Sequence, residues 1–393
     1  CARSLLRFRS FGMSSMNVES KRSLDSIRTP AFVIDLPIFQ RNAMKMQTKA
    51  KRHNLSFRPH VKTHKCYKAA MFQTSEFAGN RKIVTSTLAE AKYFSEHGFE
   101  DILYGVPIDV RKLPEIVDIR RTCPNIHFLL DNQTVLEQIE DFAKKNDAVF
   151  SCFIKVDTGY HRAGVDPEDE DAARLVLNVH SSKYITLQGL YSHNGHSYNQ
   201  TPGDVSAIQR IADEDKTSIV AFADRLRKLG VTIKTIGVGS TPSCSVSEDF
   251  DGITEIHPGN YIFYDRQQAH IGCCTEDDIA VAVLSRVISH YPSRNKILID
   301  AGGLSFSKDQ CESGGFGKID GFPDLVLYKI SQEEGMISHR DPSKPVPFDK
   351  LPIGLALKIR PNHSCMAAAC FTEYHVLDET NHVVDIWKPC RGW

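Results

Sequence analysis

Between residues 30 and 270, short runs rich in β-branched residues alternate with longer segments of helical periodicity. This alternation is typical of βα units that build a parallel sheet. Segments 132–146 and 202–229 carry apolar residues three and four positions apart, as helices that cover a sheet do. The strand-like runs are eight in number: 57–62, 83–86, 101–105, 126–131, 150–157, 185–193, 234–239 and 254–263.

Eight βα units spread over about 240 residues match the usual size of a (β/α)8 barrel. A doubly wound open sheet would show the same alternation and stays open as the alternative. After residue 275 the helical stretches become few, and strand-like runs follow one another between Gly, Pro and Asp turns. We therefore predict an α/β protein with a (β/α)8 TIM-type barrel over residues 30–270 and a mostly β domain over residues 275–393.

Two N-terminal segments need separate interpretation. Residues 29–36, TPAFVIDL, form a strand-like run that either joins the β domain or leads straight into the first barrel helix. Residues 1–18 hold three arginines, several serines and no acid, which is the composition of a mitochondrial presequence. Because the chain begins with Cys, they are equally a processing remnant or upstream sequence. We treat them as an extension that could be disordered, and we expect a cytoplasmic protein.

Composition excludes several classes of partner. Lys plus Arg and Asp plus Glu each total 48, so no basic excess is available for a nucleic acid. No apolar run approaches the roughly 20 residues that a bilayer requires. The 11 cysteines are an odd number without repeated spacing, which indicates a reducing compartment rather than a secreted disulfide framework.

A lysine stands at the end of the first predicted strand, in Arg58-Pro-His-Val-Lys-Thr-His64. Barrels place their chemistry at this end of the strands, and a lysine desolvated there can form a Schiff base with an aldehyde. His60 lies two residues before Lys62, so we expect it on the same side of the strand, where it could tune the amine. The alternative is a solvated lysine at a strand end.

An arginine follows the fifth predicted strand, in Lys155-Val-Asp-Thr-Gly-Tyr-His-Arg162. At that position Arg162 could reach an anionic oxygen over the barrel mouth. The alternative is that Asp157 caps the next helix and Arg162 is an ordinary surface residue.

Two glycine-bearing loops follow the seventh and eighth predicted strands. One contains Gly239-Ser-Thr241 and the other Gly259-Asn-Tyr261. Barrels often hold phosphate at these loops, because glycines let backbone N–H groups come close. The pair of loops therefore predicts a phosphate site.

A histidine and a cysteine stand two residues apart, His363 and Cys365. If this stretch is extended, both side chains point to one face and could bind a soft divalent ion. Two ligands are fewer than the three that a catalytic zinc commonly takes, so water or substrate would complete the site. The alternative is a core cysteine beside a surface histidine. Cys370, Cys273 and Cys274 fit small core residues better than further ligands.

Taken together, these motifs resemble the fold-type III pyridoxal-phosphate enzymes, and within them the group of eukaryotic D-serine dehydratases and D-threonine aldolases. The resemblance runs from segment 29–35 to Cys390. Its most specific parts are Arg58-Pro-His-Val-Lys-Thr-His-Lys65, which is similar to the Schiff-base lysine motif, and His363-Ser-Cys365, which is similar to the metal pair. The resemblance implies an alanine-racemase-like fold, bound pyridoxal 5'-phosphate, and Zn2+ at His363 and Cys365.

The resemblance also implies a role for each motif. Lys62 would bind the cofactor and then act as the base, and Arg162 would contact the phenolic oxygen of the cofactor. Tyr191 and Tyr198 would face the ring or the substrate. The residues expected to hold the cofactor are His60, Lys62, Arg162, Tyr191, Tyr198, Gly239, Ser240, Thr241, Gly259, Asn260 and Tyr261. Racemases place an arginine on the seventh strand against the pyridine nitrogen, and residues 235–241 contain none, so the partner of that nitrogen stays open.

The activity that the resemblance implies is dehydration of D-serine to pyruvate and ammonia. The cofactor would act as the electron sink, and zinc would lower the barrier to loss of the β-hydroxyl. One alternative is a D-threonine aldolase, which cleaves to glycine and an aldehyde with the same lysine and metal. A non-catalytic cofactor carrier is a second alternative, against which the β domain and the His-x-Cys pair argue. In this fold type the β domain covers the barrel mouth of a partner subunit, which implies a homodimer.

Overall fold

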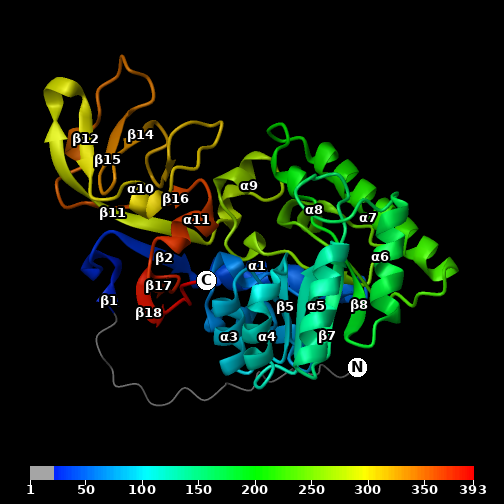
Figure 1. The fold of residues 1–393 in the computed structure, drawn as a ribbon. Coiled ribbons are helices and arrows are strands. Elements are labelled where there is room, and N and C mark those ends of the chain that lie inside the picture. Colours follow the sequence, from blue (N-terminus) through cyan, green and yellow to red (C-terminus); the bar gives the residue numbers. More distant parts are fainter. Residues whose placement is uncertain (1–21) are drawn as a thin grey trace, which may run out of the picture.

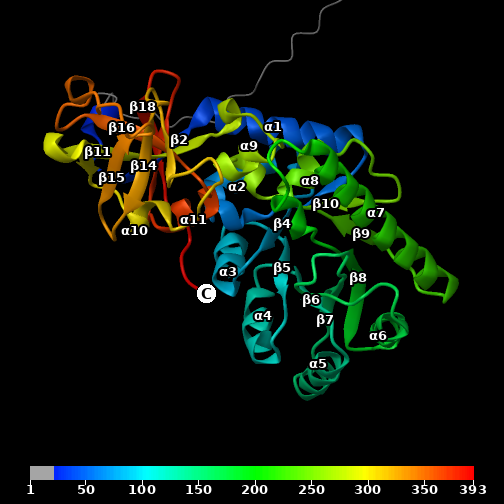
Figure 2. The ribbon, with the colours of Figure 1, turned by 90° about the horizontal axis from the view of Figure 1, so that it is seen from above.

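Two sheets account for the fold of the computed structural model, which describes residues 22–393. A parallel sheet forms the barrel, and a mostly antiparallel sheet forms the β domain beside it (Figures 1 and 2). The predicted extension, residues 1–18, lies outside the described residues. Within residues 22–393, no helix is both long enough and apolar enough to cross a membrane.

The barrel has eight parallel strands in the order β3-β10-β9-β8-β7-β6-β5-β4. They are β3 (Ser56–Phe57), β4 (Lys82–Thr85), β5 (Asp101–Pro107), β6 (Asn125–Leu130), β7 (Phe150–Lys155), β8 (Ile185–Tyr191), β9 (Thr235–Val238) and β10 (Glu255–Ile256). Between β3 and β4 the ring closes through one parallel bridge, His60 to Val84, where the Val84 N–H donates to the Pro59 carbonyl at 3.0 Å. The (β/α)8 barrel is confirmed, and the open sheet is excluded.

Helices cover the outside of the barrel (Figure 2). Most of them begin at a side chain that accepts a backbone N–H of the first turn. Asn132 accepts from the Val135 N–H at 3.3 Å, and Asp204 accepts from the Ala207 N–H at 3.0 Å. The helices are α1 (Leu36–Arg52), α2 (Tyr67–Gln73), α3 (Leu88–Glu96), α4 (Leu113–Ile119), α5 (Gln133–Lys145), α6 (Glu170–Ser181), α7 (Val205–Lys228), α8 (Thr241–Val246) and α9 (Arg266–His270).

Two strands of the β domain, β1 and β2, come from the N-terminal part of the chain. Strand β2 (Ala31–Asp35) pairs antiparallel with β11 and parallel with β17. Helix α1 begins at the next residue, so the run at 29–36 both joins the β domain and leads into the barrel. The other strands are β1 (Arg22–Ser23), β11 (Val281–Tyr291), β12 (Lys296–Ile299), β13 (Gly317–Ile319), β14 (Leu325–Ile330), β15 (Gly335–His339), β16 (Ala356–Pro361), β17 (Tyr374–Leu377) and β18 (His382–Trp387), with short helices α10 (Gly303–Phe306) and α11 (Ser364–Ala369).

The first and eighth barrel strands are shorter than predicted, and those two predictions were wrong in length. Strand β3 ends at Phe57 and β10 at Ile256. A proline follows each of them two residues later, Pro59 and Pro258. Proline has no N–H to donate, so regular strand pairing ends there. Beyond it the barrel continues only through single contacts, such as the His60 N–H that donates to the Pro258 carbonyl at 3.0 Å.

Alternation along the strands sorts the inward side chains of the barrel into three layers. The middle layer is the apolar cluster of Val84, Leu103, Leu129, Phe153 and Tyr191. Two residues earlier along the strands lies a polar layer with Arg58, Asp101, His127, Ser151 and Glu255. Two residues later lies the mouth layer, with His60, Ser86, Gly105, Lys155 and His193.

The polar layer is a buried network centred on Arg58. Its Nε donates to Glu255 Oε1 at 2.7 Å, its Nη1 donates to Asp101, and His127 Nε2 lies 3.3 Å from Asp101. Burial alone would raise the pKa of Asp101, but His127 and Arg58 outweigh it and lower that pKa. The guanidinium therefore contacts two carboxylates in this layer and helps to keep Asp101 ionised.

We predict that Arg58→Met lowers the free energy of unfolding by about 3 to 5 kcal/mol, because it leaves buried carboxylates without their cation. Urea unfolding followed by circular dichroism measures the change. The matched substitution is Arg52→Met, which breaks an exposed ion pair with Glu248 and should cost less than about 1 kcal/mol. Equal, small losses in the two variants would contradict the role given to the polar layer.

Candidate active site

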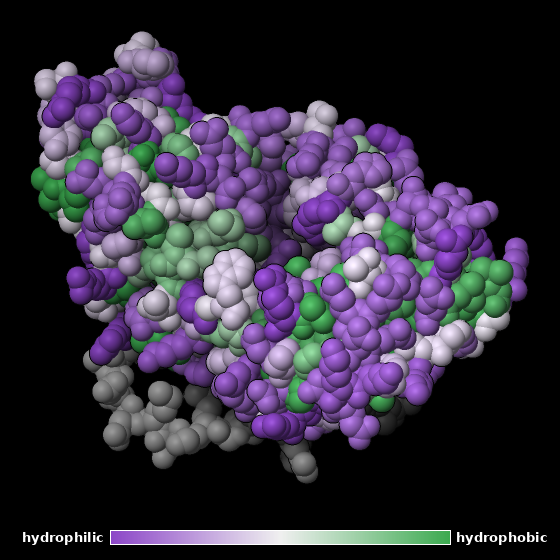
Figure 3. All heavy atoms as spheres, in the orientation of Figure 1, coloured by the Kyte–Doolittle hydropathy of each residue, from purple (hydrophilic) through white to green (hydrophobic). Residues whose placement is uncertain are grey.

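The mouth layer of the barrel lines a cavity of ≈ 320 Å³. That volume is at the lower end of the range for small-molecule sites. Four of the predicted cofactor-binding residues line it: His60, Lys62, Arg162 and Tyr191. The surface is hollowed between the barrel and the β domain (Figure 3).

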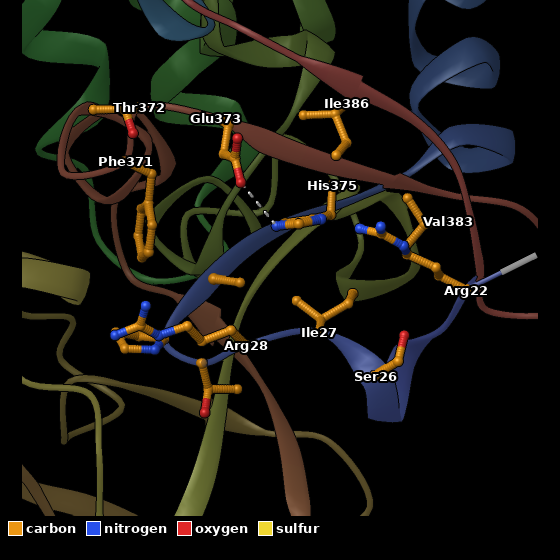
Figure 4. Close-up of a pocket in the computed structure, with 13 residues that line it drawn as sticks. Arg22, Ser26, Ile27, Arg28, Phe371, Thr372, Glu373, His375, Val383 and Ile386 are labelled. Atoms are coloured by element: carbon orange, nitrogen blue, oxygen red, sulfur yellow. Dashed lines mark ion pairs between the residues drawn. The ribbon is translucent and has the colours of Figure 1, made fainter.

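A larger cavity of ≈ 550 Å³ lies in the β domain, between β1, β2, β17 and β18 (Figure 4). Arg22 and Arg28 line it, together with His375, whose Nε2 lies 3.6 Å from Glu373. It shares no lining residue with the cavity at the barrel mouth, and no lysine or cysteine lines it. The chemistry predicted from the sequence therefore belongs to the barrel mouth.

Lys62 lies on a 3-10 turn, η2 (Val61–Thr63), rather than on the first strand. His60 precedes this turn, and its Nδ1 accepts the Lys62 N–H at 3.3 Å. The expectation that both residues share one side of a strand was therefore wrong, and the turn brings them together instead. Burial lowers the pKa of Lys62, and the opposing effect of Cys365 does not restore it. The amine is accordingly easier to deprotonate than a surface lysine.

Two further histidines in and beside the cavity have their tautomers fixed by carbonyl oxygens. His193 Nδ1 lies 2.7 Å from the Gly239 carbonyl, and His257 Nε2 lies 2.8 Å from the Ser192 carbonyl. Because a carbonyl only accepts, each of these nitrogens carries the proton, which leaves His193 Nε2 and His257 Nδ1 as acceptors. Burial holds the pKa of both imidazoles well below the usual value, so both are neutral.

Lys155 is a second amine in the cavity, and the sequence interpretation did not single it out. Its side chain is 5% exposed, and its Nζ lies 5.1 Å from the centre of the Tyr191 ring. Burial lowers the pKa of Lys155 to about 8. Strict alternation from Ser151 and Phe153 would have placed Lys155 in the mouth layer, so the signal was present in the sequence.

The two predicted phosphate loops lie side by side and are hydrogen-bonded to each other. The Tyr261 N–H donates to Thr241 Oγ1 at 3.1 Å, and the Thr241 N–H donates to Tyr198 Oη at 3.2 Å. Tyr198 therefore lies against these loops and does not line the cavity beside Lys62. Its hydroxyl accepts from the backbone, so its own O–H can still donate to an anion.

Glycines let these loops approach the histidines of the site. A Cβ on Gly259 would lie 3.0 Å from His60 Cβ, and a Cβ on Gly239 would lie 3.1 Å from two atoms of His257. Contacts this short displace the neighbouring residue in a close-packed interior. The two glycines are therefore required for the packing of His60 and His257, in addition to any role toward phosphate.

The predicted metal pair lies at the start of helix α11. His363 is the N-cap residue and Cys365 is in the first turn, so the assumption of an extended stretch was wrong. Cys365 Sγ lies 3.1 Å from Thr63 Oγ1 and 3.4 Å from Asn260 Nδ2. The β domain thereby brings its cysteine against the turn that carries Lys62, and α11 lies at the junction with the barrel (Figures 1 and 2).

The two side chains of the pair shift each other's pKa in opposite directions. Burial would lower the pKa of His363, but Asp309 and Cys365 outweigh it and raise that pKa to about 11. Burial would raise the pKa of Cys365, but His363 outweighs it and the net shift is downward. A cysteine sulfur and an imidazole nitrogen suit Zn2+, which displaces the protons of both when it binds. Within residues 22–393, no group of three or more His, Cys, Asp or Glu side chains is placed to hold a metal.

A buried carboxylate fixes the position of the pair relative to the barrel. Asp265 Oδ2 accepts the Ser364 N–H at 2.9 Å and Asn260 Nδ2 at 2.8 Å. Asp265 also caps helix α9 by accepting the Gln268 N–H at 3.0 Å. One side chain thus connects the start of α11, the loop after β10 and the start of α9.

Comparison with known proteins agrees with this arrangement. Residues 34–267 match the family model of the alanine racemase N-terminal domain, and residues 280–377 match that of a serine dehydratase domain. A D-serine dehydratase of Dictyostelium discoideum is 36% identical over 95% of this chain and 100% of its own length. A D-threonine aldolase of an Arthrobacter species is 28% identical over 86% of each chain.

Among solved structures, D-threo-3-hydroxyaspartate dehydratase from Delftia sp. HT23 is similar, with a TM-score of 0.90 and 32% identity over 95% of this chain and all of that one. The same enzyme was solved with a histidine replaced by alanine and with a cysteine two positions later replaced by alanine. The cysteine variant is in the metal-free form.

We predict that the stability contributed by Lys155 rises with pH. Its pKa is about 8 in the folded protein against 10.5 as the ordinary value, so between these values the unfolded chain binds more protons. Relative to Lys155→Met, the free energy of unfolding of the cofactor-free protein should rise by about 3 kcal/mol across this window. Urea unfolding at a series of pH values measures it.

The control is Lys183→Met, because the exposed Lys183 also lies 5.1 Å from a tyrosine ring centre, that of Tyr184. A difference for Lys155 that does not change with pH would show that its amine is not desolvated.

Proposed function

The chain belongs to the alanine-racemase-like enzymes, in the group of the D-serine dehydratases, and on this premise we propose that it converts D-serine to pyruvate and ammonia. It is a lyase that acts on a D-amino acid with pyridoxal phosphate. The reaction removes water from the substrate and consumes water when the product enamine is hydrolysed. The observation that carries the proposal is the contact of Cys365 with Thr63, which unites the metal pair and the lysine turn in one site.

The residues at the barrel mouth fit pyridoxal phosphate. Lys62 supplies an amine, and the exposed Arg162 supplies a cation at the same cavity. The hydroxyls of Tyr198 and Thr241 each accept one N–H and can donate outward to a phosphate. When bound, the cofactor supplies an electron sink for the α-carbon.

Lys62 is the residue that we assign to proton transfer at the α-carbon. Its lowered pKa makes the neutral amine accessible, as a general base requires. The neighbouring His60 and His193 are held neutral by burial and leave the amine without a competing charge from imidazolium.

His363 and Cys365 are the residues that we assign to zinc. Their donor atoms suit the ion, and Cys365 lies against the lysine turn, where the β-hydroxyl of a bound substrate would have to leave. The metal-free cysteine variant of the Delftia enzyme supports the assignment, because its two replaced residues have the spacing of this pair. A bound Zn2+ supplies a Lewis acid that lowers the barrier to loss of a poor leaving group.

D-threonine aldolase activity remains the second candidate, since the Arthrobacter relative bears that name. It would use the same lysine and metal, and the products distinguish the two reactions. The homodimer expected from the resemblance is also a proposal, which sedimentation of the cofactor-loaded protein tests.

We predict that the protein loaded with pyridoxal phosphate and zinc forms pyruvate from D-serine and not from L-serine. A zinc chelator should lower the rate by about 100-fold or more, because the hydroxyl then leaves without a Lewis acid. A coupled pyruvate assay measures both results, and readdition of Zn2+ should restore the rate.

Glycine formed from D-threonine, without pyruvate from D-serine, would replace the dehydratase by the aldolase. Full activity after removal of the metal would overturn the assignment of zinc.

We predict that Lys62→Ala removes the visible absorbance of the lysine-bound cofactor and lowers pyruvate formation by at least about 100- to 10,000-fold, since both attachment and the base are lost. Lys68→Ala is the control, because Lys68 is partly exposed and its Nζ pairs with Asp385 at 2.7 Å. Retention of the absorbance in Lys62→Ala would assign the attachment to another amine, of which Lys155 is the nearest candidate in the cavity.

A further inference from the structure

A carboxylate lies behind the histidine of the metal pair. Asp309 Oδ2 is 3.4 Å from His363 Nδ1. The two residues lie on different segments of the β domain, one after α10 and the other at the start of α11. Their side chains are each about one-third exposed, 36% for Asp309 and 34% for His363. The contact is therefore at the solvent-accessible edge of the site.

The position of Asp309 is fixed by two hydrogen bonds to Ser307. Ser307 Oγ donates to Asp309 Oδ2 at 2.8 Å, and the Asp309 N–H donates back to Ser307 Oγ at 3.2 Å. Ser307 has φ 66° and ψ −172°, a backbone conformation that is almost restricted to glycine. Holding a serine there costs about 1 to 3 kcal/mol, and such strain collects at functional sites.

The backbone of Asp309 is also tied to the residue that precedes His363. Asn362 is buried, and its Nδ2 donates to the Asp309 carbonyl at 3.1 Å and to the Gly315 carbonyl at 2.8 Å. Arg266 Nη1 donates to Asn362 Oδ1 at 2.7 Å. The segments that carry the carboxylate and the imidazole are thus joined both through their side chains and through Asn362.

We propose that Asp309 is a positioning residue that orients His363 as a ligand of the divalent metal. This inference rests on the metal site of the proposed function. A carboxylate that accepts the proton of one imidazole nitrogen fixes the tautomer and makes the other nitrogen a better donor to a metal. With Nδ1 directed at Asp309, Nε2 is the nitrogen left for the ion.

Asp309 acts through His363 and is not itself a ligand. The described residues contain no group of three His, Cys, Asp or Glu side chains placed around one ion position, so Asp309 does not join Cys365 and His363 around a common centre. The cysteine has its own support in Thr63 and Asn260, which contact its sulfur from the barrel. Cys365 is therefore positioned by residues of the barrel, and His363 by Asp309 of the β domain.

The test is the zinc affinity of the cofactor-loaded enzyme, measured by competition with a chromophoric chelator. We expect Asp309→Asn to weaken binding by about 10-fold and Asp309→Ala by up to about 100-fold, because the amide still accepts a hydrogen bond without the charge. The visible spectrum with Co2+ as the probe should change in both variants. The cofactor absorbance and the midpoint of thermal unfolding should stay at the values of the wild type.

Asp320→Asn is the matched control. Asp320 is also partly exposed in the β domain and accepts from Arg360 Nε at 2.8 Å, away from the metal pair. Its substitution should leave the zinc affinity unchanged.

Three results would overturn the inference. Wild-type zinc affinity in Asp309→Asn and Asp309→Ala would refute it while leaving the metal site intact. Weaker binding that appears only together with a lowered unfolding midpoint would make Asp309 a structural residue. Absence of zinc binding by the wild type would refute the metal part of the proposed function and this inference with it, and the titration of the wild type separates this case from the first.

Discussion

The position of the Lys62 turn depends on contacts from both parts of the molecule. Strand β3 stops five residues before Lys62, and the last barrel contact before the turn is the His60 N–H, which donates to the Pro258 carbonyl at 3.0 Å. The β domain adds further contacts: Tyr374 Oη donates to the His64 carbonyl at 3.1 Å, and the Cys390 N–H donates to the Lys65 carbonyl at 2.7 Å. With the contact between Cys365 and Thr63, three separate segments of the β domain meet one turn. Displacement of the β domain would therefore disturb the lysine and the metal pair together.

Burial is the second condition of the site. The mouth layer places amines and imidazoles above an apolar layer, where water cannot solvate their charged forms. Desolvation accordingly lowers the pKa of Lys62, Lys155 and His193. The polar layer below the apolar one differs, because there the charge of Arg58 is compensated by hydrogen bonds to two carboxylates. The same barrel thus pairs a cation with carboxylates in one layer and leaves amines and imidazoles with lowered pKa values in another.

The sequence predicted most of the architecture but only part of the site. Periodicity located all eight barrel strands, and the motifs around Lys62 and Cys365 named residues that the fold brings together. The lengths of the first and eighth strands failed because the prolines that end them were not weighed against the β-branched pattern. Asp309 could not be found, since its contact with His363 spans 54 positions and depends on a strained turn that no local pattern predicts.

Strand β2 has a consequence for the order in which the chain is made. It lies between β11 and β17 in the sheet, yet it leaves the ribosome some 250 residues before β11 and some 340 residues before β17. During that interval both of its edges lack partners while the barrel that follows it can assemble. A nascent chain of this kind carries an apolar, unpaired strand, and pairing with another such strand is an aggregation hazard. Synthesis of the C-terminal third ends this exposure, because β11 and β17 then pair with the two edges of β2.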